Sequence, residues 1–98
     1  MQFKDAFILK IKIRCSGDLY INNKFVSFAE FEDSLLKLKE IKGAVWFFRE
    51  NSFGIPNEIA EQVFKRILQM KVAVSLSSIE DFSDWIDENG QSFPRLSS

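Results

Sequence analysis

The chain has 98 residues, of which 46% are apolar and 11 are phenylalanine, enough for one domain with its own hydrophobic core. Thirteen basic and 14 acidic residues give a net charge of −1, which provides no general attraction to nucleic acid or to an anionic membrane. With no histidine and one cysteine, the sequence excludes an intrachain disulfide and the usual zinc sites. The missing histidine also removes the commonest general base, so we expect a protein that is not an enzyme and uses no cofactor.

The expected location is the bacterial cytoplasm. The N-terminal residues contain no uninterrupted apolar stretch of the length that a signal peptide needs. The sequence has no run of ~20 apolar residues, the length of a membrane-spanning helix, and we expect no membrane association. A lone cysteine agrees with a reducing compartment.

The first quarter of the chain predicts a β-hairpin. Residues 7–14 alternate between apolar side chains and mostly basic ones, which is typical of a half-buried strand. The basic row on the outward side of this strand consists of Lys10, Lys12 and Arg14. Residues 19–21 resume the strand pattern, and Asn22-Asn23 suits the positive φ angles of a tight turn. A short return strand follows over residues 24–26.

Two helices and two strands follow the hairpin. Ser27 and Glu30 have the spacing of a capping box, so a helix begins there. The apolar run over residues 44–48 indicates a central strand covered on both faces. Residues 59–70 carry a broad apolar helical face, and residues 72–76 form the last expected strand.

The last twenty residues differ in composition from the rest. Four apolar residues recur at near-helical spacing and predict a short docked helix: Ile79, Phe82, Trp85 and Ile86. Five carboxylates make the segment acidic: Glu80, Asp81, Asp84, Asp87 and Glu88. We therefore divide the chain into a single α/β domain over residues 1–78 and a partly docked acidic tail over residues 79–98, with a loose end.

The predicted fold is an α+β, two-layer sandwich with the order β-β-α-β-α-β. Each β-α-β step should make a right-handed parallel crossover, while the hairpin is antiparallel, so the sheet is mixed. Two crossovers of the same hand place both helices on one face of the sheet. The tail adds a short C-terminal helical segment.

The hairpin and first helix resemble a known family. The segment Leu-Tyr-Ile-Asn-Asn-Lys-Phe-Val-Ser-Phe-Ala-Glu-Phe-Glu over residues 19–32 is similar to the soluble domain of the ExbD/TolR biopolymer-transport family. The likeness extends over roughly residues 7–77. It implies the same topology, a tendency to dimerise and binding through sheet edges. That family carries a transmembrane helix with a functional aspartate, which this sequence does not match, so no transport role and no site residue carry over.

Two surfaces are candidate partner sites. On the outer sheet face, Lys10, Lys12, Arg14 and Tyr20 could form a single-stranded RNA platform with nearby aromatic residues, or simply a solvated strand face. In the tail, Phe82, Asp84 and Trp85 could anchor a partner, or the aromatic residues could cover the open sheet. The acidic residues could also lie on a solvated helix face, or mimic nucleic acid and plug a basic partner.

Two further positions have a plain structural interpretation. Cys15 shares strand parity with the core residues, so we expect a buried thiol rather than a nucleophile. The loop over residues 49–54 follows the central strand at the edge where open α/β sheets bind ligands, although most loops merely connect. The leading hypothesis is a non-enzymatic protein-interaction domain; the alternative is an immunity or inhibitor protein that neutralises a toxin through its acidic surface.

Overall fold

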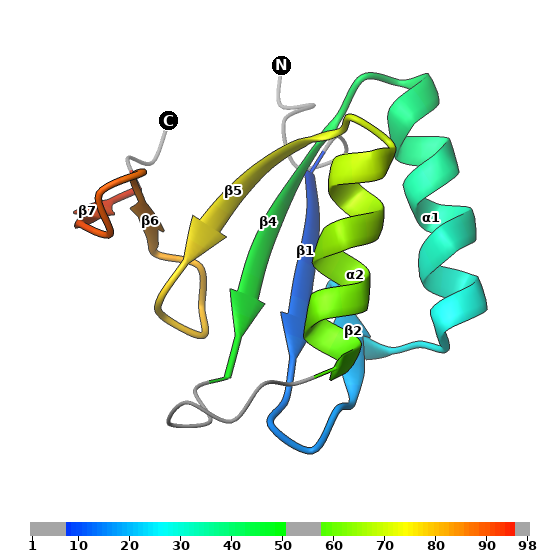
Figure 1. Cartoon of the computed structure of the whole chain (residues 1–98), viewed down its shortest axis with the longest axis horizontal. Helices are drawn as coiled ribbons and strands as arrows, with labels where there is room; N and C mark the ends of the chain where they lie inside the picture. The colour runs from blue at the N-terminus through cyan, green and yellow to red at the C-terminus, as the bar shows by residue number, and fades with distance from the viewer. Residues whose placement is uncertain (1–7, 51–57, 96–98) are drawn as a thin grey trace.

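The computed structural model describes residues 8–50 and 58–95 (Figure 1). Its elements follow one another in the order β1 (Ile8–Ile13), β2 (Leu19–Ile21), β3 (Lys24–Phe25), α1 (Phe28–Glu40), β4 (Ala44–Arg49), α2 (Glu58–Gln69), β5 (Ala73–Ser77), β6 (Asp84–Ile86) and β7 (Ser92–Pro94). Residue 7 of the predicted first strand and residues 96–98 at the end of the tail lie outside the described residues, whereas residues 92–94 of the end predicted to be loose form β7.

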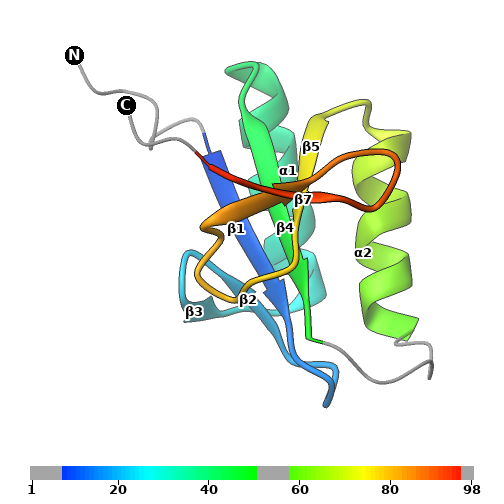
Figure 2. The ribbon, with the colours of Figure 1, turned by 90° about the vertical axis from the view of Figure 1, so that its left-hand side faces the viewer.

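In the described part of the chain, all seven strands join one sheet in the order β3-β2-β1-β4-β5-β6-β7. β1, β4 and β5 are parallel neighbours, and the remaining pairs are antiparallel. Both helices lie on the same face of this sheet, as Figures 1 and 2 show. The predicted α+β sandwich with a mixed sheet is therefore confirmed, and β6 and β7 extend it beyond the predicted order.

The core lies between the helices and the central strands. Ile11 and Ile13 of β1 are fully buried, and the parallel register pairs Ile11 with Phe47 of β4. The helices contribute the buried side chains of Phe31, Leu35, Leu38, Ala60, Val63 and Ile67. These positions recur every three or four residues, because only that spacing keeps side chains on one face of a helix.

Local signals in the hairpin and first helix work as expected. Asn22 and Asn23 have φ angles of 50° and 70°, the left-handed conformation that asparagine tolerates. The backbone N–H of Glu30 donates to Ser27 Oγ at 3.1 Å, and the Ser27 N–H donates to Glu30 Oε1 at 2.8 Å. This reciprocal pair is the predicted capping box, and it fixes the start of α1.

The predicted C-terminal helix is wrong, because β6 and β7 form a hairpin in its place. Phe82 has a φ angle of 62°, which a right-handed helix does not allow. The Asp87 carboxylate accepts the backbone N–H groups of Asn89 and Gln91 and closes the turn between the strands. Figure 2 shows the hairpin running across the direction of the central strands. The near-helical spacing of apolar residues was thus produced by a turn and a short strand.

A matched pair of substitutions in α2 tests the assignment of the core. Ile67 is fully buried and its neighbour Leu68 is 53% exposed. We expect Ile67→Ala to lower the free energy of unfolding by about 2–5 kcal/mol, since it leaves a cavity in the core. Leu68→Ala should change it by no more than about 0.5 kcal/mol. Urea unfolding of both variants measures the difference, and equal losses would contradict the packing described for α2.

Candidate functional site

The predicted basic row does lie on the sheet face opposite the helices. The β1–β4 register pairs Lys10 with Trp46 and Lys12 with Phe48, and the β1–β2 register pairs Lys12 with Tyr20. Partners in register point to the same face of a sheet, so these five side chains share the outer face. The prediction that aromatic residues accompany the basic row on this face is therefore confirmed.

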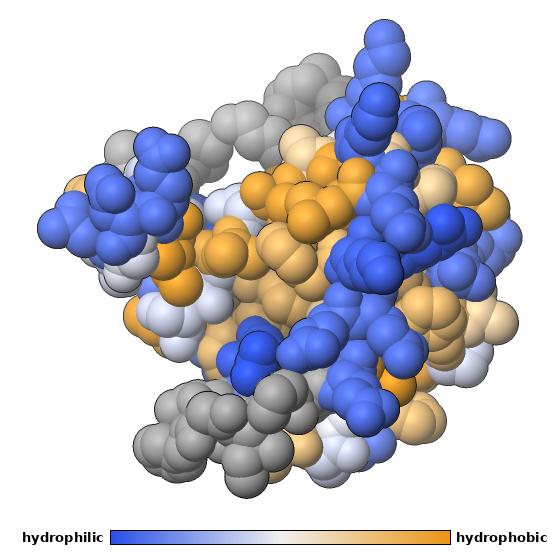
Figure 3. Space-filling view, in the orientation of Figure 1, coloured by the Kyte–Doolittle hydropathy of each residue, from blue (hydrophilic) through white to orange (hydrophobic). Residues whose placement is uncertain are grey.

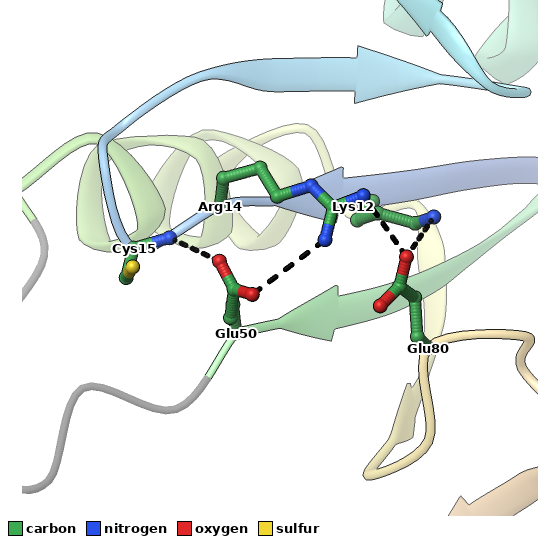
Figure 4. A network of polar contacts seen from close by, with 5 residues as sticks. All are labelled: Lys12, Arg14, Cys15, Glu50 and Glu80. Carbon is green, nitrogen blue, oxygen red and sulfur yellow. Dashed lines mark hydrogen bonds and ion pairs between the residues drawn. The ribbon is translucent and has the colours of Figure 1, made fainter.

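The basic row is already engaged by two carboxylates of the same chain (Figure 4). Glu80 Oε2 lies 3.0 Å from Lys12 Nζ and 2.9 Å from Arg14 Nη2. Glu50 Oε2 lies 3.5 Å from Arg14 Nη1, while its other oxygen accepts the Cys15 backbone N–H at 2.8 Å. Hydrogen bonds from Lys12 and Arg14 lower the pKa of Glu80, and the Cys15 N–H lowers that of Glu50. Both carboxylates are thus ionised at neutral pH.

The tail covers the aromatic part of the outer face. The Phe82 ring packs against Trp46 and Phe48, with ring centroids 6.5 and 6.4 Å apart, and only 6% of Phe82 is exposed. The Arg95 guanidinium lies 4.0 Å from the Trp46 ring centroid and donates to the hydroxyl of Ser77 at 2.7 Å. The alternative in which tail aromatics cover the open sheet therefore holds for Phe82.

Trp85 remains at the surface. It is 38% exposed and stacks on Phe93 of β7, with ring centroids 5.0 Å apart. The two residues are partners in the β6–β7 register, so the hairpin itself holds the rings together. Unlike Phe82, this aromatic pair is accessible to another molecule.

Asp84 is buried, which removes it from the predicted partner-binding surface. It is 2% exposed, and its carboxylate accepts hydrogen bonds from the backbone N–H groups of Ser78 and Ile79 and from the hydroxyls of Ser78 and Ser92. Burial by itself would raise the pKa of Asp84, but these hydrogen bonds outweigh it and lower the pKa to about 2. The carboxylate ties the loop after β5 to the hairpin.

The other tail carboxylates do not form a solvated helix face. Asp81 accepts the Ser83 N–H at 2.9 Å, and Asp87 closes the hairpin turn. Glu80 is the ion-pair partner of the basic row. Most of the acidic residues that suggested a nucleic-acid mimic are therefore turn-forming or paired within the chain.

The prediction that Cys15 is buried is wrong, since its side chain is exposed. β1 ends at Ile13, so strand parity no longer applies two residues later. Cys15 lies in the turn before β2, where its backbone N–H is held by Glu50. Alternation predicts burial only as far as the strand itself continues.

Sequence reasoning did not identify a groove on the helix face. It has a volume of about 560 Å³ and opens between α2, the ends of β4 and β5, and β6. Its apolar lining comes from Phe47, Ala60, Phe64, Leu76 and Ile86. Figure 3 shows apolar surface between α2 and the hairpin. One feature of the sequence could have predicted this groove. The apolar face of α2 is wider than the single row of residues that pack into the core.

The groove lies at the sheet edge that the loop over residues 49–54 follows, the position for which a connecting loop was expected and ligand binding was the alternative. Arg49, the last residue of β4, lines it together with Glu61, Ser77 and Ser78. Residues 51–54 of the predicted loop lie outside the described residues. Across residues 8–50 and 58–95, no group of three or more cysteine, aspartate or glutamate side chains is placed to hold a metal ion. No helix in that part of the chain has the length and apolar character needed to cross a membrane.

Comparison with known proteins adds no assignment. No protein-family model matches the chain, and no curated protein matches it. The likeness to the ExbD/TolR domains therefore stays a resemblance of pattern.

The buried carboxylate makes a pH-dependent contribution to stability. The pKa of Asp84 is about 2 in the folded chain and 3.8 without the fold, so the ionised group favours folding. This stabilisation, about 2 kcal/mol, should be complete above about pH 5 and be lost as the pH falls toward 2. Asp84→Asn should remove this acid dependence and lower stability at pH 7 by about 1–3 kcal/mol. Urea unfolding at several pH values tests this, with exposed Glu88→Gln as the control that should behave like wild type.

Proposed function

We propose that this protein is a non-enzymatic protein-interaction domain whose apolar groove receives a helical segment of a protein partner. The observation that carries the proposal is the open groove of about 560 Å³ between α2, β5 and the β6–β7 hairpin. Its five apolar lining side chains offer favourable burial to apolar groups of a partner, and its polar lining residues, Arg49, Glu61, Ser77 and Ser78, offer hydrogen bonds at the rim of such a contact.

The groove exists because the helix layer does not extend over the whole sheet. Val45 and Phe47 of β4 are 0% and 6% exposed beneath the helices. Val74 and Leu76 of β5 point to the same side by register and are only partly buried. Packed helices are about 8–10 Å apart and strands about 4.8 Å apart, so one helix covers about two strands. A partner helix over β5 and β6 would continue the layer that α1 and α2 begin.

The hairpin supplies one wall of the groove. Ile86 of β6 lines the groove, while its strand neighbour Trp85 points to the opposite face of the hairpin and stacks there on Phe93. The exposed aromatic pair therefore faces away from the groove. We expect the partner to contact Ile86 and not the aromatic pair.

Other functions have less support. A toxin inhibitor acting through acidic mimicry needs free carboxylates, whereas Asp84 is buried and Glu80 is paired with Lys12 and Arg14. Dimerisation through sheet edges needs an extended strand with unpaired backbone groups. β3 has two residues, and β7 has three, including Pro94, which has no N–H to donate.

An isoleucine pair tests the groove. Ile86→Ser places a hydroxyl in the groove, while Ile79→Ser makes the same change at a residue that is 46% exposed and outside the groove lining. Wild type and both variants are immobilised, and proteins captured from the lysate of the source bacterium are identified by mass spectrometry. We expect one protein to be retained by wild type and Ile79→Ser and to be reduced at least about tenfold on Ile86→Ser.

Circular dichroism and urea unfolding of the three proteins serve as the control for folding. The same captured proteins in the same amounts on all three would rule out the groove as the binding site. The groove would also be ruled out if the captured protein bound to wild type and Ile86→Ser but not to Ile79→Ser.

A further inference from the structure

The outer face of the sheet holds part of its own chain in the manner of a bound peptide. Residues 80–82, Glu-Asp-Phe, come from the loop between β5 and β6 and lie against strands β1 and β4. Glu80 contacts the basic row through its carboxylate, and Phe82 contacts the aromatic residues of β4 through its ring. The contacts are made by side chains two residues apart, with Asp81 exposed between them.

The charge arrangement defines what this face accepts. Lys12 and Arg14 converge on a single oxygen of Glu80, within 3.0 Å. The side chain of Lys12 is only 12% exposed, whereas that of Glu80 is 50% exposed. Lys12 is thus built into the face and Arg14, 35% exposed, lies at its margin, while the carboxylate approaches from the solvent side. Two cations that share one carboxylate form a site for an anionic side chain.

A cavity continues from the Glu80 contact along the same face. It has a volume of about 360 Å³ and is lined by Lys10, Lys12, Asn23 and residues of the 80–82 segment. Lys10 Nζ lies 5.4 Å from the centroid of the Trp46 ring, so a second cation lies beside an aromatic surface. The face therefore offers basic and aromatic contacts in addition to those that residues 80–82 already use.

The covering segment has features of a displaceable contact. Phe82 is a bulky residue in the left-handed region, with a φ of 62°, an unfavourable conformation that must be held by its surroundings. Glu80 is half exposed, and ion pairs of solvent-exposed carboxylates contribute little to stability. Asp84 anchors the chain immediately after the segment through buried hydrogen bonds. Arg95 Nε donates to the Phe82 carbonyl at 3.0 Å, so a displacing peptide must replace this hydrogen bond and the ring contacts, while Asp84 keeps the hairpin attached.

We propose that the outer face at Lys12, Arg14, Trp46 and Phe48 is a peptide-recognition surface that residues 80–82 occupy in the isolated chain. Its ligand is an extended acidic peptide with an aromatic side chain two residues after a carboxylate. Such a segment of a partner displaces the internal one by making the same contacts and by adding contacts in the cavity at Lys10. This surface lies on the opposite side of the sheet from the groove, so it does not depend on the function proposed above.

The test uses the chain's own segment as the probe. A capped peptide with the sequence of residues 77–84, Ser-Ser-Ile-Glu-Asp-Phe-Ser-Asp, is titrated into ¹⁵N-labelled full-length protein and followed by NMR. The proteins are wild type, Glu80→Gln, and Glu80→Gln combined with Lys12→Gln. Loss of the Glu80 carboxylate removes its ion pairs with Lys12 and Arg14, so Glu80→Gln should bind the peptide about fivefold more tightly than wild type.

The double variant should lose most of this binding, and shifts should include the Trp46 indole signal. A control peptide with Gln and Ala in place of its Glu and Phe should not bind. Because Glu80 is half exposed, its replacement by Gln should leave the protein folded. The NMR spectrum of each variant without peptide checks that it is folded. No binding by either wild type or Glu80→Gln at millimolar peptide overturns the proposal, and so do equal affinities of the two proteins.

Discussion

The buried carboxylate of Asp84 is the interaction on which the C-terminal third of the molecule depends. It accepts hydrogen bonds from the loop after β5 and from Ser92 of β7, so one side chain joins the sheet, the loop and the hairpin. A buried charge is costly unless its oxygens are fully hydrogen-bonded, and here hydrogen bonds lower its pKa to about 2 in spite of burial. The position of the hairpin follows from this anchor.

Both proposed surfaces depend on where that hairpin lies. On the helix side, Ile86 of β6 forms one wall of the groove, and residues of α2 and β5 form the facing walls. On the outer side, the chain between Ser77 and Asp84 passes over the outer face of the sheet. This path brings Glu80 to the basic row and Phe82 to the aromatic residues of β4. The two faces are chemically different: one is apolar and partly uncovered, whereas the other is basic and aromatic and is covered by the same chain.

Short-range patterns predicted the elements that depend on short-range physics. The Ser27–Glu30 capping box, the Asn22-Asn23 turn and the alternation in β1 act over four residues or fewer, and the structure contains all three. The errors have equally specific causes. Parity was extended to Cys15, two residues past the end of β1, and the spacing of tail apolar residues matched a helix although Phe82 has a positive φ. In a short segment, periodicity does not distinguish a helix from a turn followed by a strand.

The sequence by itself determined the mixed two-layer fold and the presence of a basic row on the outer strand face, because periodicity and capping are local properties. Only the tertiary structure decided that Glu80 and Glu50 pair with Lys12 and Arg14 of that row, that Asp84 is buried rather than exposed, and that a groove remains beside α2. Ion pairs between Lys12 and Glu80 join residues 68 positions apart. Such contacts depend on the path of the whole chain, and no local pattern of residues encodes them.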